Sequence, residues 1–146
     1  MRTYFDEIID LALVEVRDYK IDKLYNSNID KFKIYCDGFL IRAIGEFNEC
    51  MQSLDYDELE RVFFNDLTRE EKSILADYWV IEWLKSETQT VEYFNLHLND
   101  RSFKHYSEAT NFREKRSYLN ELREKVKQKI VEYQINNFQN IQGLQM

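Results

Sequence analysis

The sequence predicts an all-α protein: a compact bundle of about four to six helices with a long C-terminal helix and an extended C-terminal tail. Two observations carry this prediction. The 146 residues include no proline and only three glycines, whereas the turns of sheet proteins recruit both residue types. Apolar residues also recur at helical spacing along most of the chain. With 44% hydrophobic residues, we expect one helical domain over residues 1–134, followed by an uncharged arm over 135–146.

An amphipathic helix is predicted from about residue 3 to residue 20. Asp6 and Glu7 lie in its first turn, where carboxylates interact favourably with the helix dipole. A short second segment follows, and Asn26-Ser27-Asn28 offers caps for the next helix. The apolar positions of the first helix recur every three or four residues: Phe5, Ile8, Ile9, Ala12, Val16 and Tyr19.

The most apolar stretch predicts a central core helix over residues 29–51. Gly38 and Gly45 each weaken a helix by roughly 1 kcal/mol relative to alanine. Their spacing puts them on similar faces, so we expect the backbone of another segment to approach closely there. A strand over Phe32–Ile44 remains an alternative that fits the spacing less well. The apolar stripe comprises Ile29, Phe32, Cys36, Phe39, Leu40, Ala43, Ile44 and Phe47.

Beyond this helix, residues 53–66 are acidic and predict a solvated linker or a short helix. Thr68 with Glu71 forms a capping box that opens a helix to about Ser86. Thr88 or Thr90 is then expected to cap a short helix, and Ser107 a long one from about residue 108 to 134. The narrow apolar stripe of the long helix has nearly heptad spacing and consists of Phe112, Leu119, Leu122, Val126, Ile130 and Tyr133.

The last twelve residues, 135–146, contain no charged side chain. Ile135, Phe138, Ile141 and Leu144 recur at every third position. Two interpretations are open: a frayed terminus, or a docking arm that becomes ordered on a partner. These four residues are therefore candidate partner-binding residues.

The formal charge of −7 is distributed unevenly. Residues 1–66 hold 8 Lys and Arg against 15 Asp and Glu, whereas residues 67–146 hold 12 of each. An acidic half repels phosphate, which argues against a DNA-binding surface there and suits a basic protein partner or a channel through which DNA slides. Seven Lys and Arg residues between positions 113 and 129 are interrupted by glutamates, which is typical of a solvated helix face.

Cys36 and Cys50 are the only cysteines. If both lie on the central helix, they are roughly 21 Å apart at 1.5 Å per residue, whereas a disulfide needs Cα atoms within about 7 Å. We therefore expect two reduced, buried thiols of an intracellular protein. The acidic N-terminus and the lack of a long apolar run lead us to expect neither a signal peptide nor a transmembrane segment.

The residue patterns of common catalytic sites are missing from the sequence. None of the glycines belongs to a phosphate-binding loop, and His97 and His105 are separated by a predicted helix break. Carboxylate pairs such as Glu121 with Glu124 are usual on solvated helices. We expect no catalytic residues, no cofactor and no metal site, and hence not an enzyme.

Three stretches resemble small virion proteins of tailed bacteriophages known as head–tail connector, neck or adaptor proteins. They are Asp37-Gly38-Phe39-Leu40-Ile41-Arg42-Ala43-Ile44, Ile74-Leu75-Ala76-Asp77 with Trp83-Leu84, and Phe103-Lys104-His105-Tyr106-Ser107-Glu108-Ala109. The resemblance covers roughly three quarters of the chain and includes no catalytic signature.

The resemblance implies a helical subunit of a homo-oligomeric ring, of about twelve copies, beneath the portal of the virion neck. Its partners are then the portal protein and a downstream neck or tail protein, with DNA passing through the ring without sequence-specific binding. Phe103, His105 and Tyr106 become candidate partner-binding residues. The expected location is the virion, and the host cytoplasm during assembly.

Two other functions are compatible with the sequence. A small acidic inhibitor or regulator, encoded by a phage, would block a nucleic-acid enzyme by presenting carboxylates in place of phosphates. Its feature would be one exposed face holding Asp55, Asp57, Glu58 and Glu60. A helical interaction domain of another context is the remaining alternative.

Overall fold

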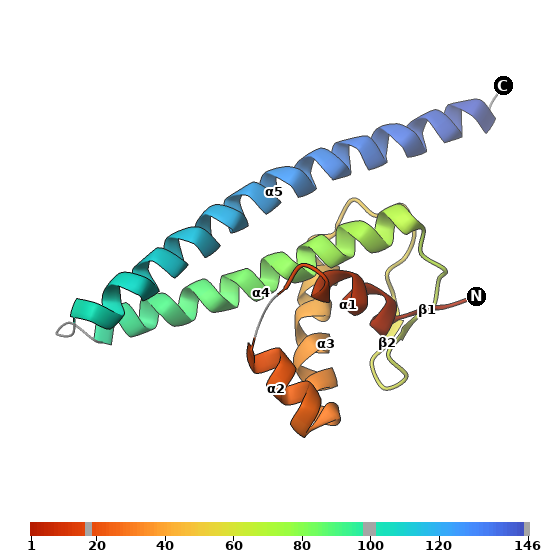
Figure 1. Ribbon diagram of the computed structural model, residues 1–146. Helices are drawn as coiled ribbons and strands as arrows, with labels where there is room; N and C mark the ends of the chain where they lie inside the picture. The colour runs from red at the N-terminus through yellow and green to blue at the C-terminus, as the bar shows by residue number, and fades with distance from the viewer. Residues whose placement is uncertain (17–18, 98–101, 145–146) are drawn as a thin grey trace.

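The structure is a computed structural model that describes residues 1–16, 19–97 and 102–144. Its described part is mainly helical, which confirms the predicted fold class. Two long helices, α4 and α5, form an antiparallel pair, and the shorter elements pack on the N-terminal half of α4 (Figure 1). In chain order the elements are β1 (Thr3–Tyr4), α1 (Phe5–Leu13), α2 (Tyr19–Ser27), α3 (Ile29–Glu46), β2 (Tyr56–Asp57), β3 (Val62–Phe63), α4 (Arg69–His97) and α5 (Ser102–Leu144).

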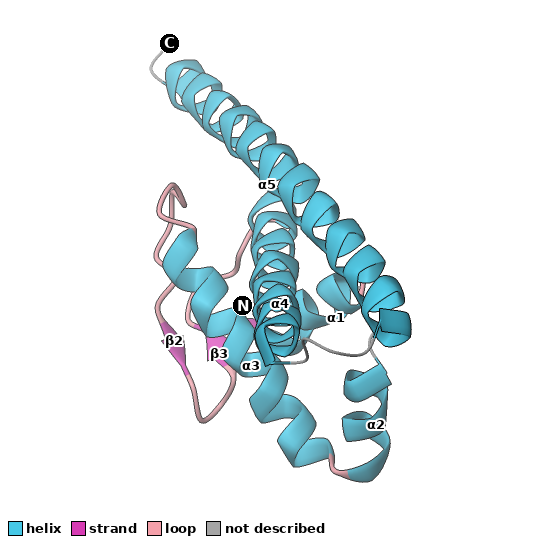
Figure 2. Cartoon of the chain, turned by 90° about the vertical axis from the view of Figure 1, so that its left-hand side faces the viewer, coloured by secondary structure: helices cyan, strands magenta, loops and turns pink. Residues whose placement is uncertain are grey.

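Helix α4 is the centre of the core and contacts α1, α3 and α5. Both views place α5 on one side of α4 and α3 on the other (Figures 1 and 2). Trp79 of α4 is fully buried, stacks edge-to-face on Phe39 of α3, and donates a 2.9 Å hydrogen bond from its indole Nε1 to the Cys36 carbonyl. Because a buried indole N–H needs an acceptor, this bond fixes how α3 lies against α4.

A small antiparallel sheet of order β1-β3-β2 replaces the linker or short helix expected before Asp66. Thr3 pairs with Phe63, and Tyr56 pairs with Phe63 from the other side. The Phe5 ring packs against the Phe63 ring at a centroid distance of 5.2 Å. The sheet therefore joins the N-terminus to the β2–β3 hairpin. The paired segments are about sixty residues apart in sequence, so no local sequence pattern predicts their pairing.

Two predicted helices are shorter in the structure. α1 ends at Leu13 rather than near residue 20, because the amides of Glu15 and Val16 bond carbonyls three residues back and close the last turn. α3 ends at Glu46 rather than at residue 51. Phe47 leaves the helical conformation and its buried ring packs on Tyr133 of α5 at 5.6 Å.

The expectation that Cys36 and Cys50 share a helix was therefore wrong, because Cys50 lies beyond the end of α3. Both cysteines are free thiols, Cys36 buried and Cys50 half-buried. No described helix is long and apolar enough to cross a membrane.

The two long helices extend further than predicted. α4 continues through Thr88 to His97, and the Thr88 hydroxyl donates to the Lys85 carbonyl at 3.0 Å inside the helix instead of capping a new one. α5 already begins at Ser102, so the backbone of Ser107 lies within the helix. The expected tail is not extended, since α5 remains helical to Leu144.

Several local predictions are confirmed. The Thr68 amide donates to the Glu71 carboxylate at 2.8 Å and the Glu71 amide to the Thr68 hydroxyl at 3.2 Å, which completes the capping box. The Asn28 side chain accepts from the Lys31 amide at the start of α3. The predicted stripe of α5 is buried at Leu119, Leu122, Val126, Ile130 and Tyr133, whereas the Phe112 side chain lies outside the described residues.

Candidate interaction surfaces

The middle of α5 is fixed to the rest of the molecule by a buried polar cluster around Glu71. Burial by itself raises the pKa of this carboxyl, but the hydrogen bonds it accepts outweigh burial and leave its pKa lowered. The cluster is therefore a satisfied, charged anchor between α4, α5 and the loop after α3. The donors are the Thr68 amide at 2.8 Å, the Tyr133 hydroxyl at 2.7 Å, the Cys50 thiol at 3.3 Å and the Gln52 side-chain amide.

Further polar contacts hold α5 at Lys129 and Tyr118. The Lys129 ammonium donates to Asp77 at 2.5 Å and to Ser73 at 2.9 Å, both on α4. The Tyr118 hydroxyl donates to Glu15 at 2.8 Å, which ties α5 to the chain after α1. Up to Tyr133, α5 is thus an integral part of the bundle.

From Val131 to Phe138, the face of α5 opposite the buried Tyr133 is exposed. The helix extends past the beginning of α4 and away from the remaining helices (Figure 1). Val131, Ile135 and Phe138 are 53%, 50% and 59% exposed, although all three are large and apolar. We call residues 131–144 the α5 arm. Its three exposed apolar side chains lie at i, i+4 and i+7 and therefore form one stripe on the helix surface.

The arm includes some of the residues selected from the sequence. Ile135 and Phe138 were expected to bind a partner, and both are exposed on the arm. The backbones of Ile141 and Leu144 continue the same helix, but their side chains lie outside the described residues. The side chains of Phe103, His105 and Tyr106 also lie outside the described residues. Their backbones belong to the first turns of α5, more than twenty residues from the arm.

A second apolar surface lies on the opposite side of α4, between α3 and the β2–β3 hairpin. A groove of about 480 Å³ opens there. Ile34 is 73% exposed on α3 and Leu59 is 94% exposed at the tip of the hairpin. We call this the α3–hairpin groove. It is lined by Asp30, Lys33, Ile34, Asp37, Gly38, Ile41, Glu58, Leu59 and Arg61.

Gly38 lies in the middle of this groove. The predicted close approach of another backbone to Gly38 and Gly45 was wrong within the chain, since a Cβ atom at either position meets nothing within 4 Å. The gap at Gly38 therefore opens outward into the groove. Ile34 and Ile41 lie outside the apolar stripe that the sequence predicts for the central helix. Two features of the sequence could have indicated this surface. Ile34 and Ile41 lie four residues before and three residues after Gly38, and Leu59 is an apolar residue between Glu58 and Glu60.

Arg61 joins the hairpin to α3 and lines the groove. Its guanidinium donates two 2.7 Å hydrogen bonds to the Asp37 carboxylate and forms a 2.8 Å ion pair with Asp6 of α1. The hydrogen bonds to Asp37 raise the pKa of the guanidinium above its already high value. Arg61 has a φ of 56°, and its carbonyl accepts from the Phe5 amide at 2.9 Å. This strained backbone is retained because three elements converge on one side chain.

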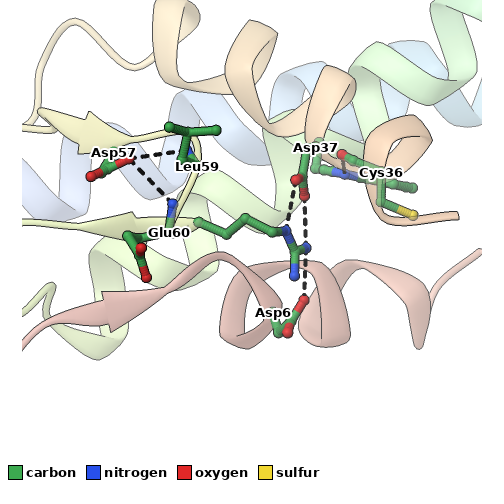
Figure 3. Close-up of polar contacts among 8 residues, drawn as sticks. Asp6, Cys36, Asp37, Asp57, Leu59 and Glu60 are labelled. Carbon is green, nitrogen blue, oxygen red and sulfur yellow. Dashed lines mark hydrogen bonds and ion pairs between the residues drawn. The ribbon is translucent and has the colours of Figure 1, made fainter. Parts of the chain in front are cut away.

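The acidic hairpin is less uniform than expected. Asp55, Glu58 and Glu60 are exposed, but Asp57 is half-buried and accepts from the amides of Leu59 and Glu60 at 3.0 and 3.2 Å (Figure 3). Asp57 therefore stabilises the turn itself. Three carboxylates remain available to a partner.

In the described residues, no cluster of three or more His, Cys, Asp or Glu side chains has the arrangement of a metal site. Burial raises the pKa of the Cys36 thiol to about 12 and that of Cys50 to about 11. Such thiols are protonated at neutral pH and are poor nucleophiles.

Comparison of the chain with family models, with curated proteins and with solved structures finds no match in any of the three.

Proposed function

We propose that this chain is a structural subunit of the neck of a tailed bacteriophage. It acts as a head–tail connector that forms a homo-oligomeric ring under the portal and joins the portal to the tail. DNA passes through the ring without sequence-specific binding. In this proposal the chain binds proteins and catalyses no reaction, and its partners are further copies of itself, the portal protein and a neck or tail protein.

The observation that carries the proposal is the presence of two different apolar surfaces on opposite sides of α4, the α5 arm and the α3–hairpin groove. A subunit of a cyclic ring contacts its two neighbours through different surfaces. Exposed side chains of the size of Phe138 and Leu59 favour association when they lie in contiguous patches. The polar anchor at Glu71 keeps the arm rigid relative to the body, as a repeated assembly requires.

The stretches that resemble connector proteins support the proposal through their positions. Ile74, Leu75 and Leu84 of α4 are almost fully buried. Asp37 and Gly38 of α3 line the groove. The resemblance thus concerns both the core of the bundle and one of its candidate contact surfaces.

The charge distribution supports passage of DNA past the protein rather than binding to it. Residues 1–66, with their balance of −7, include α1, α2, α3 and the hairpin. A ring that turned this acidic part toward its channel would repel the phosphates and allow DNA to slide.

Electron microscopy of purified particles, at a resolution that distinguishes helices, tests the proposal. We expect a closed ring between portal and tail in which each subunit contains the α4–α5 pair. Antibody labelling of an epitope tag on the chain should mark the same junction. The proposal is wrong if the chain occurs elsewhere in the particle or only outside it.

A second candidate function is supported by the three exposed carboxylates of the hairpin, Asp55, Glu58 and Glu60. In an inhibitor of a nucleic-acid enzyme, these groups would occupy the enzyme's phosphate-binding surface. Affinity purification of the tagged chain from infected cells distinguishes the two functions. Recovery of a polymerase or nuclease, lost when all three residues are changed to Asn or Gln, would favour the inhibitor over the connector.

A further inference from the structure

We propose that the α5 arm of one copy of this chain docks in the α3–hairpin groove of a second copy, with the arm parallel to α3 and Ile135 packed over Gly38. This inference rests on the proposed self-association of the chain and names the two surfaces that make the contact. It also assigns a role to Gly38, which has none inside the monomer.

The first argument is that the two surfaces have the same spacing. On α5, Lys127 just before the arm and Val131, Ile135 and Phe138 on the arm occupy positions i, i+4, i+8 and i+11. On α3, the same positions are occupied by Asp30, Ile34, Gly38 and Ile41. At 3.6 residues per turn, each set falls within about 80° of its helix surface. Two stripes of equal length can therefore lie along each other over their whole extent.

The second argument is complementary shape. The groove stripe has open space at Gly38, where a Cβ atom would meet nothing within 4 Å. In the parallel register, the branched side chain of Ile135 lies opposite this gap. Helix axes approach to about 8–10 Å, and small residues at the crossing permit the shorter end of that range. Leu59, on the hairpin, then covers the side of the docked arm.

The third argument is complementary charge. The parallel register brings Lys127, whose side chain is 73% exposed and forms an exposed 3.4 Å ion pair with Glu124 of its own helix, next to Asp30. Glu58 on the hairpin adds a second carboxylate to the rim of the groove, where Arg61 is already paired with Asp37. The arm itself carries no charge from residue 135 onward, so it brings no further charge onto the charged residues that line the groove, Asp30, Lys33, Asp37, Glu58 and Arg61. An antiparallel arm would place Lys127 beyond Ile41, away from Asp30.

The two surfaces of one copy cannot meet, because the arm belongs to a continuous helix on the side of α4 opposite α3 (Figures 1 and 2). Each copy can therefore give its arm to one neighbour and receive the arm of another. Such a head-to-tail contact produces a ring when the rotation between subunits closes and a filament when it does not.

Disulfide trapping tests the register directly. A Gly38→Cys chain is mixed with an Ile135→Cys chain under mild oxidation. Facing positions on packed helices lie within the roughly 7 Å between Cα atoms that a disulfide allows. We expect a crosslinked heterodimer. Gly45→Cys mixed with Ile135→Cys is the matched control, since Gly45 lies on the same helix, has equally open space and is not part of the groove.

We expect the Gly38 pair to crosslink at least about tenfold more than the Gly45 pair, for contacts central to an interface. The wild-type chain, whose thiols are buried or half-buried, gives the background. Equal yields for the two pairs, or no crosslink with either, would overturn the inference.

A mixing experiment tests the head-to-tail nature of the contact. Gly38→Glu should block the groove and Ile135→Asp should disable the arm, so that each variant alone sediments as a monomer. The mixture should form a dimer and nothing larger, through the one intact surface of each chain. Gly45→Glu should assemble like wild type.

Failure of the inference and failure of the proposed function give different results. Particles assembled with the Gly38→Glu chain and still showing a normal ring would exclude this contact while leaving the connector function in place. A specific crosslink in solution, with the chain missing from the particle, would support the contact and exclude the connector.

Discussion

The Tyr133 hydroxyl of α5 donates a 2.7 Å hydrogen bond to the buried Glu71 carboxylate of α4, and it accepts a 2.8 Å hydrogen bond from the Met51 amide. One hydroxyl thus joins α5, α4 and the loop after α3. Tyr133→Phe keeps the ring in the core but leaves the buried Glu71 carboxylate and the part-buried Met51 amide each short of one partner. We expect a loss of about 1–3 kcal/mol in the free energy of unfolding, measured by urea denaturation.

Tyr118→Phe is the matched control for this prediction. Tyr118 also lies on α5 and donates a 2.8 Å hydrogen bond to a glutamate, but this bond to Glu15 is exposed. Water replaces the lost partner, so we expect a change below about 1 kcal/mol. Equal effects of the two substitutions would contradict the central role of the Glu71 cluster.

The Glu71 cluster also predicts a pH dependence of stability. The pKa of Glu71 is lowered in the folded protein from its ordinary value of 4.5, because the hydrogen bonds it accepts outweigh its burial. Unfolded chains then bind more protons, so the stabilisation is complete above pH 4.5 and is lost as the pH falls through the lower folded value. We expect Glu71→Gln to be less stable at pH 7 and to lose less stability on acidification. If the wild type and Glu71→Gln lose the same free energy of unfolding on acidification, this prediction is wrong.

Arg61 allows a comparison of two carboxylates on one guanidinium. The Asp37 side chain is 13% exposed and that of Asp6 is 59% exposed. Asp37→Asn should cost about 2–4 kcal/mol, since it breaks a shielded two-bond pair, whereas Asp6→Asn should cost less than about 1 kcal/mol. Thermal unfolding of both variants measures the difference. If Asp6→Asn is the more damaging, the hairpin is not held through α3.

Local sequence signals predicted much of this fold. The capping box of Thr68 and Glu71, the Asn28 cap and the buried stripe from Leu119 to Tyr133 depend on residues within a few positions of one another. Each of these local features therefore forms wherever the surrounding structure permits a helix, so the sequence alone predicts it. The ends of the long helices were harder to predict from the sequence, because a residue such as Thr88 can either cap a new helix or donate to a carbonyl of the preceding turn.

The sheet and the groove could not be predicted in the same way. Strands of two residues carry no periodicity, and β1 pairs with β3 across about sixty residues. The positive φ of Arg61 is maintained by Asp6 and Asp37, which are distant in sequence. Whether Ile34 or Phe138 is core or surface depends on which helix packs against it. The sequence identified Ile135 and Phe138 on the arm, but not the groove on the opposite side.

The two thiols should react slowly and at different rates. Burial raises the pKa of Cys36 to about 12 and that of Cys50 to about 11. Because the thiolate is the reactive form and Cys36 is also the more buried, alkylation at pH 8 should modify Cys50 first. Mass spectrometry of the native protein follows both sites, and the protein unfolded in urea is the control in which they react equally. Faster modification of native Cys36 would contradict its place in the core.

Replacing the glycines of α3 by alanine tests the open space around them. At both Gly38 and Gly45 an added Cβ meets nothing within 4 Å, so alanine gains helix propensity without a clash. Gly38 is in the middle of the helix, where the gain should be about 1 kcal/mol; Gly45 lies next to the last residue, where the helix frays and the gain is smaller. Urea denaturation at low protein concentration, which favours the monomer, measures both. Destabilisation by Gly38→Ala under these conditions would mean that the gap is filled from within the monomer, and Gly38 would then no longer be available to an arm from a second copy.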